Sequence, residues 1–238
     1  MKKMMISLCL FFSSLSTYAL DANEMVRKAD LKRGLGNTEH TFTVQVTNTK
    51  TDKKELYKVF FKNVNSTLTE QLEPEKSKGR KMLMKDYDIW LFTPNIKKPI
   101  RISLEQKLTG EVSNGDIAKT NYAEDYDAKV LTTENTPNGK MVKLELVAKN
   151  KKVTYGRIEY SLLEKDFSPQ EAIFFALSGK PLKRARFLDY KKIQGEMRAT
   201  KMIIQDYIQK EKESVLVFDN YKKESLNESM FNKDSLEF

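Results

Sequence analysis

The residue types that usually perform acid–base or metal chemistry are scarce in this chain of 238 residues. Its single histidine, His40, has no second histidine with which to build a common zinc site. A histidine that acts as a general base also needs an orienting partner and a nucleophile. We therefore expect His40 to be a surface residue at the edge of the first strand. The only cysteine, Cys9, lies near the N-terminus, which leaves the rest of the chain without a thiol nucleophile or thiolate ligand.

Two DYD triplets contain the remaining candidates for catalysis. The carboxylate pairs Asp86/Asp88 and Asp125/Asp127 could bind calcium, or they could act as the acid and base of a glycoside hydrolase. In each triplet the acidic side chains alternate about a tyrosine, which is typical of a turn or strand end. The sequence has no phosphate-binding loop, GxSxG elbow or HExxH helix. We expect a protein that is not an enzyme and that needs no metal or other cofactor, with a paired-carboxylate hydrolase as the alternative.

The N-terminus has the pattern of a secretory signal peptide. Two lysines precede an apolar run from Ile6 to Phe12, and small residues follow up to Ala19. We predict a signal peptide at residues 1–19 and a single domain at residues 20–238. No later segment approaches the roughly 18 apolar residues of a membrane-spanning helix. The sequence therefore predicts an exported protein without a stable membrane anchor.

The charge of the chain is clearly basic. Its formal net charge is +9, and it stays positive without the two lysines of the predicted signal. Such a surplus favours contact with anionic surfaces such as phosphate head groups, although it can also serve only solubility. Nucleic acid is not an expected partner, because the chain is predicted to be exported and contains no recognisable reading motif.

The spacing of apolar residues predicts one helix followed by an antiparallel sheet. Asp21 to Glu24 have the form of a capping box, and apolar residues recur at helical spacing up to Gly34. From Thr41 onward, apolar and polar residues alternate as in half-buried strands. Asn138-Gly139 is suited to the tight turn of a hairpin. About ten or eleven strand-like segments follow, too many for a small barrel, so we predict one curved, meandering sheet.

The stretch from Gly79 to Tyr126 differs from this alternating pattern. Met82 to Met84 and Ile89 to Phe92 are two continuous apolar runs separated by a polar, Asp-rich turn, which predicts a hairpin. A third extended piece from Pro99 to Ser103 leads into a long segment without periodicity. Unpatterned segments of this length are usually functional, for example lids, or disordered.

Continuous apolar runs need cover on both faces of a strand. Similar runs occur at Phe60-Phe61 and from Ile173 to Leu177. Either a second layer of helices or loops covers the far face, or the additional surface lines a cavity for an apolar ligand, for which deformable methionines are suited. The sequence leaves open which face of the strand from Ile89 to Phe92 would line that cavity.

Several segments together resemble the outer-membrane lipoprotein-sorting proteins, the longer relatives of the periplasmic carrier LolA. The matching pieces are KGRKMLM, DIWLFTPNIKKPIRIS, GEVSNGDIA, AEDYDAKVL and LSGKPLKRARFLDYKKI. The resemblance implies a mainly β fold, an incomplete β-barrel of about eleven antiparallel strands closed by a few helices around an apolar cavity. LolA holds the acyl chains of lipoproteins in such a cavity. Relatives of the longer type are often associated with inner-membrane transporters of the RND superfamily.

We therefore expect a non-catalytic periplasmic carrier that binds the acyl chains of lipoproteins or lipids for transport towards the outer membrane. The alternative is a periplasmic interaction module, an accessory subunit of an RND-type transporter with no lipid cargo of its own. The expected cavity residues are Phe60, Phe61, Met82, Met84, Trp90, Phe92, Ile100, Ile102, Leu144, Phe174 and Phe175. The expected gate or lid residues are Arg101, Gly110, Asn114, Gly115 and Asp116.

Overall fold

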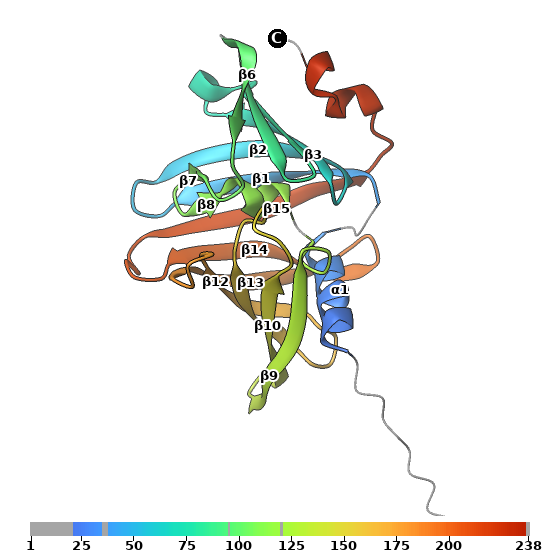
Figure 1. Ribbon diagram of the computed structural model, residues 1–238, viewed down its shortest axis with the longest axis vertical. Coiled ribbons are helices and arrows are strands. Elements are labelled where there is room, and N and C mark those ends of the chain that lie inside the picture. Colours follow the sequence, from blue (N-terminus) through green and yellow to red (C-terminus); the bar gives the residue numbers. More distant parts are fainter. Residues whose placement is uncertain (1–20, 35–37, 95, 120, 237–238) are drawn as a thin grey trace, which may run out of the picture.

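The computed structural model describes residues 21–34, 38–94, 96–119 and 121–236, so the predicted signal peptide lies outside the described residues. Most of these residues belong to one large sheet (Figure 1). Its strands are β1 (His40–Asn48), β2 (Lys53–Asn63), β3 (Ser66–Glu73), β4 (Lys81–Lys85), β5 (Asp88–Thr93), β6 (Ile96–Ile102), β9 (Tyr126–Thr136), β10 (Gly139–Ala148), β11 (Arg157–Leu163), β12 (Pro169–Phe175), β13 (Pro181–Ile193), β14 (Glu196–Asp206) and β15 (Glu213–Lys223).

The large sheet consists of two antiparallel meanders. The strand order is β6-β5-β4-β3-β2-β1-β15-β14-β13-β12-β11-β10-β9, and pairing of β1 with β15 joins the two halves. Within the described residues the outermost strands, β6 and β9, each have one neighbour, so the curved sheet stays open. The predicted incomplete barrel is confirmed, with thirteen strands in this sheet instead of about eleven.

Two helices lie on the inner face of the sheet, which we define as the face that packs against them. Helix α1 (Ala22–Arg33) packs against β9, β12 and β14 through Ala22, Val26 and Ala29. The helix begins where the sequence predicts, but the capping box does not form, because the Asp21 side chain makes no capping hydrogen bond. No helix in the described part of the chain is long and apolar enough to span a membrane.

The long segment without periodicity folds across the inner face (Figure 1). It contains the short strands β7 (Lys107–Thr109) and β8 (Val112–Ser113), which pair with each other, and helix α2 (Asn114–Ala118). We call residues 103–119 the cover segment. Its backbone is held internally, for example by Gly115 N–H donating to the Leu104 carbonyl at 2.9 Å.

The predicted hairpins are present. In the β4–β5 hairpin Leu83 pairs with Trp90, and Asp86 has the positive φ of 56° that a tight turn requires. The β9–β10 hairpin turns one residue earlier than predicted, at Pro137-Asn138, and Gly139, the first residue of β10, has φ 119° and pairs with Thr136. Polar residues tolerant of the left-handed region, and glycine, therefore stand where the backbone needs them.

The strands β2 to β5 are covered on both faces. Their outer face carries an apolar cluster of Phe60, Leu68, Leu83, Trp90 and Phe92. The C-terminal segment packs over this cluster through Leu226, Met230, Phe231 and Leu236, in and around the short 3-10 helices η2 (Glu228–Phe231) and η3 (Lys233–Ser235). For these strands, a second layer accounts for the continuous apolar runs on the outer face.

The C-terminal segment is tied to β2 by one lysine. Lys62 Nζ donates to the Leu226 carbonyl at 2.9 Å and lies 2.8 Å from both Glu39 and Glu228. Lys62 has the same strand parity as Phe60, so it lies on the outer face beside the apolar cluster.

Candidate ligand-binding groove and its cover

A groove of about 480 Å³ lies on the inner face between strands β2–β6 and the cover segment. Its volume is within the roughly 300–1,000 Å³ of typical ligand pockets. The groove is lined by Lys53, Glu55, Tyr57, Thr69, Gln71, Lys76, Ser77, Arg80, Lys81, Met82, Leu91, Ile102, Gln106, Lys107, Leu108 and Asn114. This groove is our candidate for the ligand-binding site.

Strand register brings the floor of the groove together. Tyr57 pairs with Gln71, Thr69 with Met82, and Met82 with Leu91. Side chains at paired positions point to the same face of a sheet, so Thr69, Met82 and Leu91 form one row across three strands, and Tyr57 and Gln71 form the neighbouring row. Ile102 and Leu108 add apolar surface from β6 and the cover segment. The groove therefore combines these apolar side chains with the polar residues of β2 and β3.

The polar residues of the groove include one buried carboxylate and one unpartnered hydroxyl. The Tyr57 hydroxyl donates to Glu55, and burial, followed by the charge and hydrogen bond of Glu55, raises the pKa of Tyr57. Lys53 is paired with the same carboxylate. Thr69 is 3% exposed, and its Oγ1 has no hydrogen-bond partner among the described residues. The groove wall therefore contains a buried hydroxyl whose hydrogen-bonding capacity is not used within the described residues.

The cover segment is fixed to the sheet by a buried lysine. Lys183 on β13 donates through Nζ to the Glu111 carbonyl at 3.0 Å, to Ser113 Oγ at 3.1 Å and to the Asp116 carboxylate. Asp116 also accepts from the Tyr155 hydroxyl at 2.6 Å. Burial lowers the pKa of Lys183, while the charge of Asp116 acts in the opposite direction. A charge pair this deep holds α2 against the sheet.

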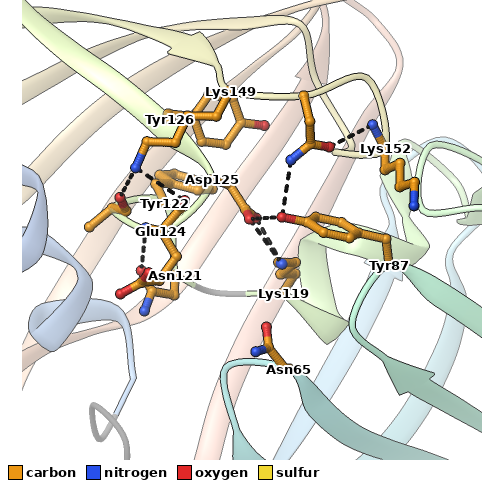
Figure 2. Close-up of polar contacts among 12 residues, drawn as sticks. Asn65, Tyr87, Lys119, Asn121, Tyr122, Glu124, Asp125, Tyr126, Lys149 and Lys152 are labelled. Carbon is orange, nitrogen blue, oxygen red and sulfur yellow. Dashed lines mark hydrogen bonds and ion pairs between the residues drawn. The ribbon is translucent and has the colours of Figure 1, made fainter.

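A second ionic cluster holds the chain that follows the cover segment (Figure 2). Lys119 Nζ lies 3.0 Å from Asp125 Oδ2, and the Tyr87 hydroxyl donates to Asp125 Oδ1 at 2.8 Å. Asn150 donates to the Tyr87 hydroxyl at 3.1 Å. This cluster joins the β4–β5 turn to the start of β9.

Helix α1 supplies a third attachment. The Asp30 carboxylate accepts the backbone N–H groups of Tyr122 and Ala123, each at 2.9 Å. Burial raises the pKa of Asp30 to about 7. Arg33, one turn further along, lies over the Tyr122 ring with its guanidinium carbon 3.9 Å from the ring centroid.

The space between α1 and the sheet is nearly filled. The cavity there has a volume of only about 30 Å³ and is lined by Arg33, Phe42, Asp116, Phe187, Ala199, Met202 and Phe218. This is far below the roughly 300–1,000 Å³ of typical ligand pockets. In this conformation the groove, and not the interior under α1, offers room for a ligand.

The structure distributes the eleven expected cavity residues over several places. Met82 and Ile102 line the groove, and Met84 lies beside them in a cluster under the cover segment. Three others, Phe60, Trp90 and Phe92, belong to the outer-face cluster. Leu144 and Phe174 belong to the main core. Phe61 contacts the ring of His40, and the ring of Phe175 lies under the guanidinium group of Arg157. Ile100 is largely exposed on the edge strand β6. These side chains therefore do not line one common cavity.

The expected gate residues, apart from Arg101, lie in the cover segment. Arg101 is exposed and paired with Asp88. Gly110 has φ 53° in the β7–β8 turn, where a Cβ would stand 2.3 Å from Ser214 Oγ. Asn114 lines the groove. Gly115 packs so closely on Thr154 that a Cβ would stand 2.0 Å from Oγ1, while Asp116 contacts Lys183.

The candidates for acid–base chemistry are placed in structural roles. His40 is buried, contrary to expectation, with its ring 4.8 Å from that of Phe61 and Nδ1 2.6 Å from the Thr38 carbonyl. Burial lowers its pKa and favours the neutral form. Asp125 is buried with Lys119, whereas Asp127 is exposed. The described residues contain no group of three or more His, Cys, Asp or Glu side chains that could hold a metal ion.

Sequence reasoning missed Lys183 and Arg33. Lys183 has the strand parity of the buried Ala185 and Phe187, and Arg33 continues the buried helical stripe of Val26 and Ala29. A charged residue at an apolar position of an otherwise regular pattern was the available signal.

Comparison with solved structures places this architecture in a family. A LolA superfamily protein from Nitrosomonas europaea is 33% identical, with a TM-score of 0.86 over 92% of this chain and 100% of that chain. The chain belongs to the LolA superfamily. A family model described as an uncharacterized protein matches residues 63–238. A comparison with curated protein sequences found no match.

Two more distant structures share the LolA-type fold. An outer membrane lipoprotein-sorting protein domain from Vibrio parahaemolyticus is 21% identical, with a TM-score of 0.73 over 90% of this chain and 97% of that chain. A DUF1329 family protein from Desulfovibrio piger is 18% identical, with a TM-score of 0.77 over the same shares. At these identities the likeness concerns the fold alone. The suspected resemblance to lipoprotein-sorting proteins is confirmed at the level of the family.

Proposed function

We propose that this protein is a non-catalytic periplasmic carrier that binds the acyl chains of lipoproteins or lipids and takes them towards the outer membrane. The observation that carries the proposal is the groove of about 480 Å³, with the apolar side chains of Met82, Leu91 and Ile102 on the inner face of a LolA-superfamily sheet. The distant relative from Vibrio parahaemolyticus, described as a lipoprotein-sorting protein domain, supports the same class of cargo.

Burial of methylene groups would drive binding. Each methylene removed from water contributes about 0.8 kcal/mol, so several methylenes on the groove floor outweigh a modest cost of ordering. The groove is bounded by the edge strand β6 and by the cover segment, both at the surface of the sheet. A bulky head group or protein moiety therefore has room outside while the chain lies inside.

Release requires a state with lower affinity for the chain. A receptor can supply it by favouring a displaced cover segment, because a ligand equilibrium shifts only through differential binding to two states. Gly110 and the residues of α2 are the proposed moving part. Movement of α2 must break the contact between Asp116 and Lys183.

The first test is direct detection of cargo. Protein purified from the periplasmic fraction without detergent should retain lipid or acylated peptide that native mass spectrometry detects. A fluorescent fatty-acid probe should bind and be displaced by unlabelled acyl ligands. A protein that carries no lipid and does not bind the probe would refute the carrier function.

Two neighbouring residues on β5 provide a matched test of the site. Leu91 lines the groove, whereas Trp90 points to the outer face under the C-terminal segment. Leu91→Ala should weaken probe binding more than Trp90→Ala does, although the second truncation is larger. Leu182→Ala, a partly exposed leucine on β13, serves as a distant control. If Leu91→Ala and Trp90→Ala lose the same amount of probe affinity, the groove is not the binding site.

An interaction module, accessory to an inner-membrane RND-type transporter, is the second candidate. Its support is a group of exposed apolar residues at neighbouring hairpin ends, with Leu177 60% and Ile208 67% exposed. The two ends are joined by Tyr207 N–H donating to the Leu182 carbonyl at 3.0 Å. A photo-crosslinking residue at position 208 should capture a membrane transporter in cells if this reading holds. Such a crosslink in a protein without bound lipid would favour the module over the carrier.

A further inference from the structure

The lining of the groove is strongly biased towards positive charge. It contains five basic residues but only one acidic residue, Glu55. Two of the basic residues already have acidic partners, since Lys53 is paired with Glu55 and Lys107 with Glu111. Lys76 and Arg80 are exposed, and neither has an acidic partner among the described residues. Two cations at a ligand-sized groove therefore lack a counter-charge.

Lys76 and Arg80 are placed by a short, well-bonded connection between β3 and β4. It contains the 3-10 helix η1 (Glu75–Ser77). The Gln71 N–H donates to the Arg80 carbonyl at 2.8 Å, and the Gly79 N–H donates to the Gln71 carbonyl at 2.9 Å. These bonds fix the connection to the strand that carries Gln71 and Thr69. The two cations are therefore held at the end of the groove, not on a free loop.

The charge of Arg80 reaches the groove itself. It opposes the rise in the pKa of Tyr57, whose ring belongs to the floor. Along β3, Gln71 lies nearer to this connection and Thr69 lies one inner-face position deeper. Thr69 contributes the buried, unpartnered hydroxyl, next to its strand partner Met82. The groove thus presents cations at one end, buried hydrogen-bonding groups on β2 and β3, and apolar side chains on β4, β5, β6 and the cover segment.

We propose that the groove holds an amphiphile with a phosphate-bearing anionic head group, so that its cargo is a glycerophospholipid and not an uncharged acyl chain. Arg80 and Lys76 bind the phosphate, and the acyl chains lie on Met82, Leu91 and Ile102. Guanidinium and ammonium groups are suited to phosphate oxygens through charge-assisted hydrogen bonds. This inference rests on the proposed carrier function and specifies the class of its ligand.

The test compares two soluble short-chain probes that differ in the head group. Dihexanoyl phosphatidylglycerol carries a phosphate, dihexanoylglycerol carries none, and sodium phosphate alone supplies the third arm. Binding is measured by calorimetry below the micelle-forming concentration. The variant is Lys76→Gln with Arg80→Gln, and the control is Lys151→Gln with Lys165→Gln, two exposed lysines elsewhere with the same change of net charge.

The wild-type protein should prefer the phospholipid over dihexanoylglycerol, and the groove variant should lose about tenfold of its affinity for the phospholipid, equivalent to about 1.4 kcal/mol. Its affinity for dihexanoylglycerol should stay unchanged. The control variant should bind both probes as the wild type does. Because all four substituted side chains are exposed, circular dichroism and the melting temperature should not change.

The outcomes separate this inference from the carrier function. Equal wild-type affinity for the two lipid probes, or a groove variant that keeps its phospholipid affinity, would overturn the head-group site and leave the carrier intact. If free phosphate binds as tightly as the phospholipid, the groove is a site for phosphate alone, and the proposal of a glycerophospholipid ligand is refuted. If neither lipid probe binds, the carrier function and this inference both fail.

Discussion

Replacing Lys183 tests whether the cover segment is locked by its buried ion pair. Lys183→Met keeps much of the side-chain length and removes the charge. Asp116 would then remain buried with the Tyr155 hydroxyl and the Ser113 N–H as its hydrogen-bond donors, and without its cation. Removing one partner of a buried pair leaves an uncompensated charge, which is more costly than losing the pair as a whole.

The expected loss in the free energy of unfolding is about 3–5 kcal/mol. For a chain of this size 1 kcal/mol corresponds to about 2–4 °C in melting temperature, so the variant should melt roughly 6 to 20 °C lower. Urea unfolding followed by circular dichroism measures the free energy. Hydrogen exchange measures the local effect, which should appear first at amides of α2 such as that of Gly115, bonded to Leu104.

The neighbouring residue on β13 provides the control. Arg184 points to the opposite face and pairs with Glu171, both partly exposed, so Arg184→Gln should cost no more than about 1 kcal/mol. Adding Asp116→Asn to Lys183→Met should recover part of the loss, because it removes the uncompensated charge. If Lys183→Met costs as little as Arg184→Gln and leaves exchange at α2 unchanged, the ion pair does not hold the cover.

Phe231→Ala should lower the stability of the C-terminal packing by about 3 kcal/mol and shift the emission of Trp90, the only tryptophan, to longer wavelength; unchanged emission would place that packing elsewhere. Burial raises the pKa of Asp30 from 3.8 to about 7, so its stabilising contribution is complete below 3.8 and is lost as pH rises through 7. Between pH 3.8 and about 7, the unfolding free energy of the wild type should fall by at most about 4 kcal/mol relative to that of Asp30→Asn. If the unfolding free energies of the two proteins change with pH in the same way, Asp30 does not titrate in this range. Gly115→Ala should cost about 1–3 kcal/mol by pushing α2 away from Thr154, and Thr154→Ala should relieve part of that cost in urea unfolding.

The regular part of the fold could be predicted because its physical signals are local. Alternation from Thr41 onward marked the strands, and Asn138-Gly139 marked the β9–β10 hairpin, whose turn lies one residue earlier at Pro137-Asn138. The Asp21 capping box failed because a favourable residue type does not guarantee that the side chain makes the bond. The strand containing Trp90 and Leu91 could not be oriented from sequence, since both residues are apolar and each face of β5 has its own cover.

The groove was less accessible to sequence reasoning because it is built from long-range pairings. Thr69 gains its place beside Met82 only through the register of β3 with β4. Arg80 reads as one more charged residue in a basic chain until the connection after β3 is placed at the end of the groove. Lys183 was visible as an exception to alternation, but its partner Asp116 lies in a segment without periodicity. A local pattern can identify such an exception without identifying its partner.

The cover segment explains why an acyl chain would occupy the groove before the interior under α1. To reach the interior, a ligand must displace α2 and separate Asp116 from Lys183, at a cost of about 3–5 kcal/mol. At about 0.8 kcal/mol for each methylene, four to six buried methylenes would only offset that cost. The groove, by contrast, has a volume of about 480 Å³ without any displacement of α2. A short chain should therefore bind in the groove alone, whereas Lys183→Met should increase the affinity for long chains more than for short ones by lowering the cost of opening the interior.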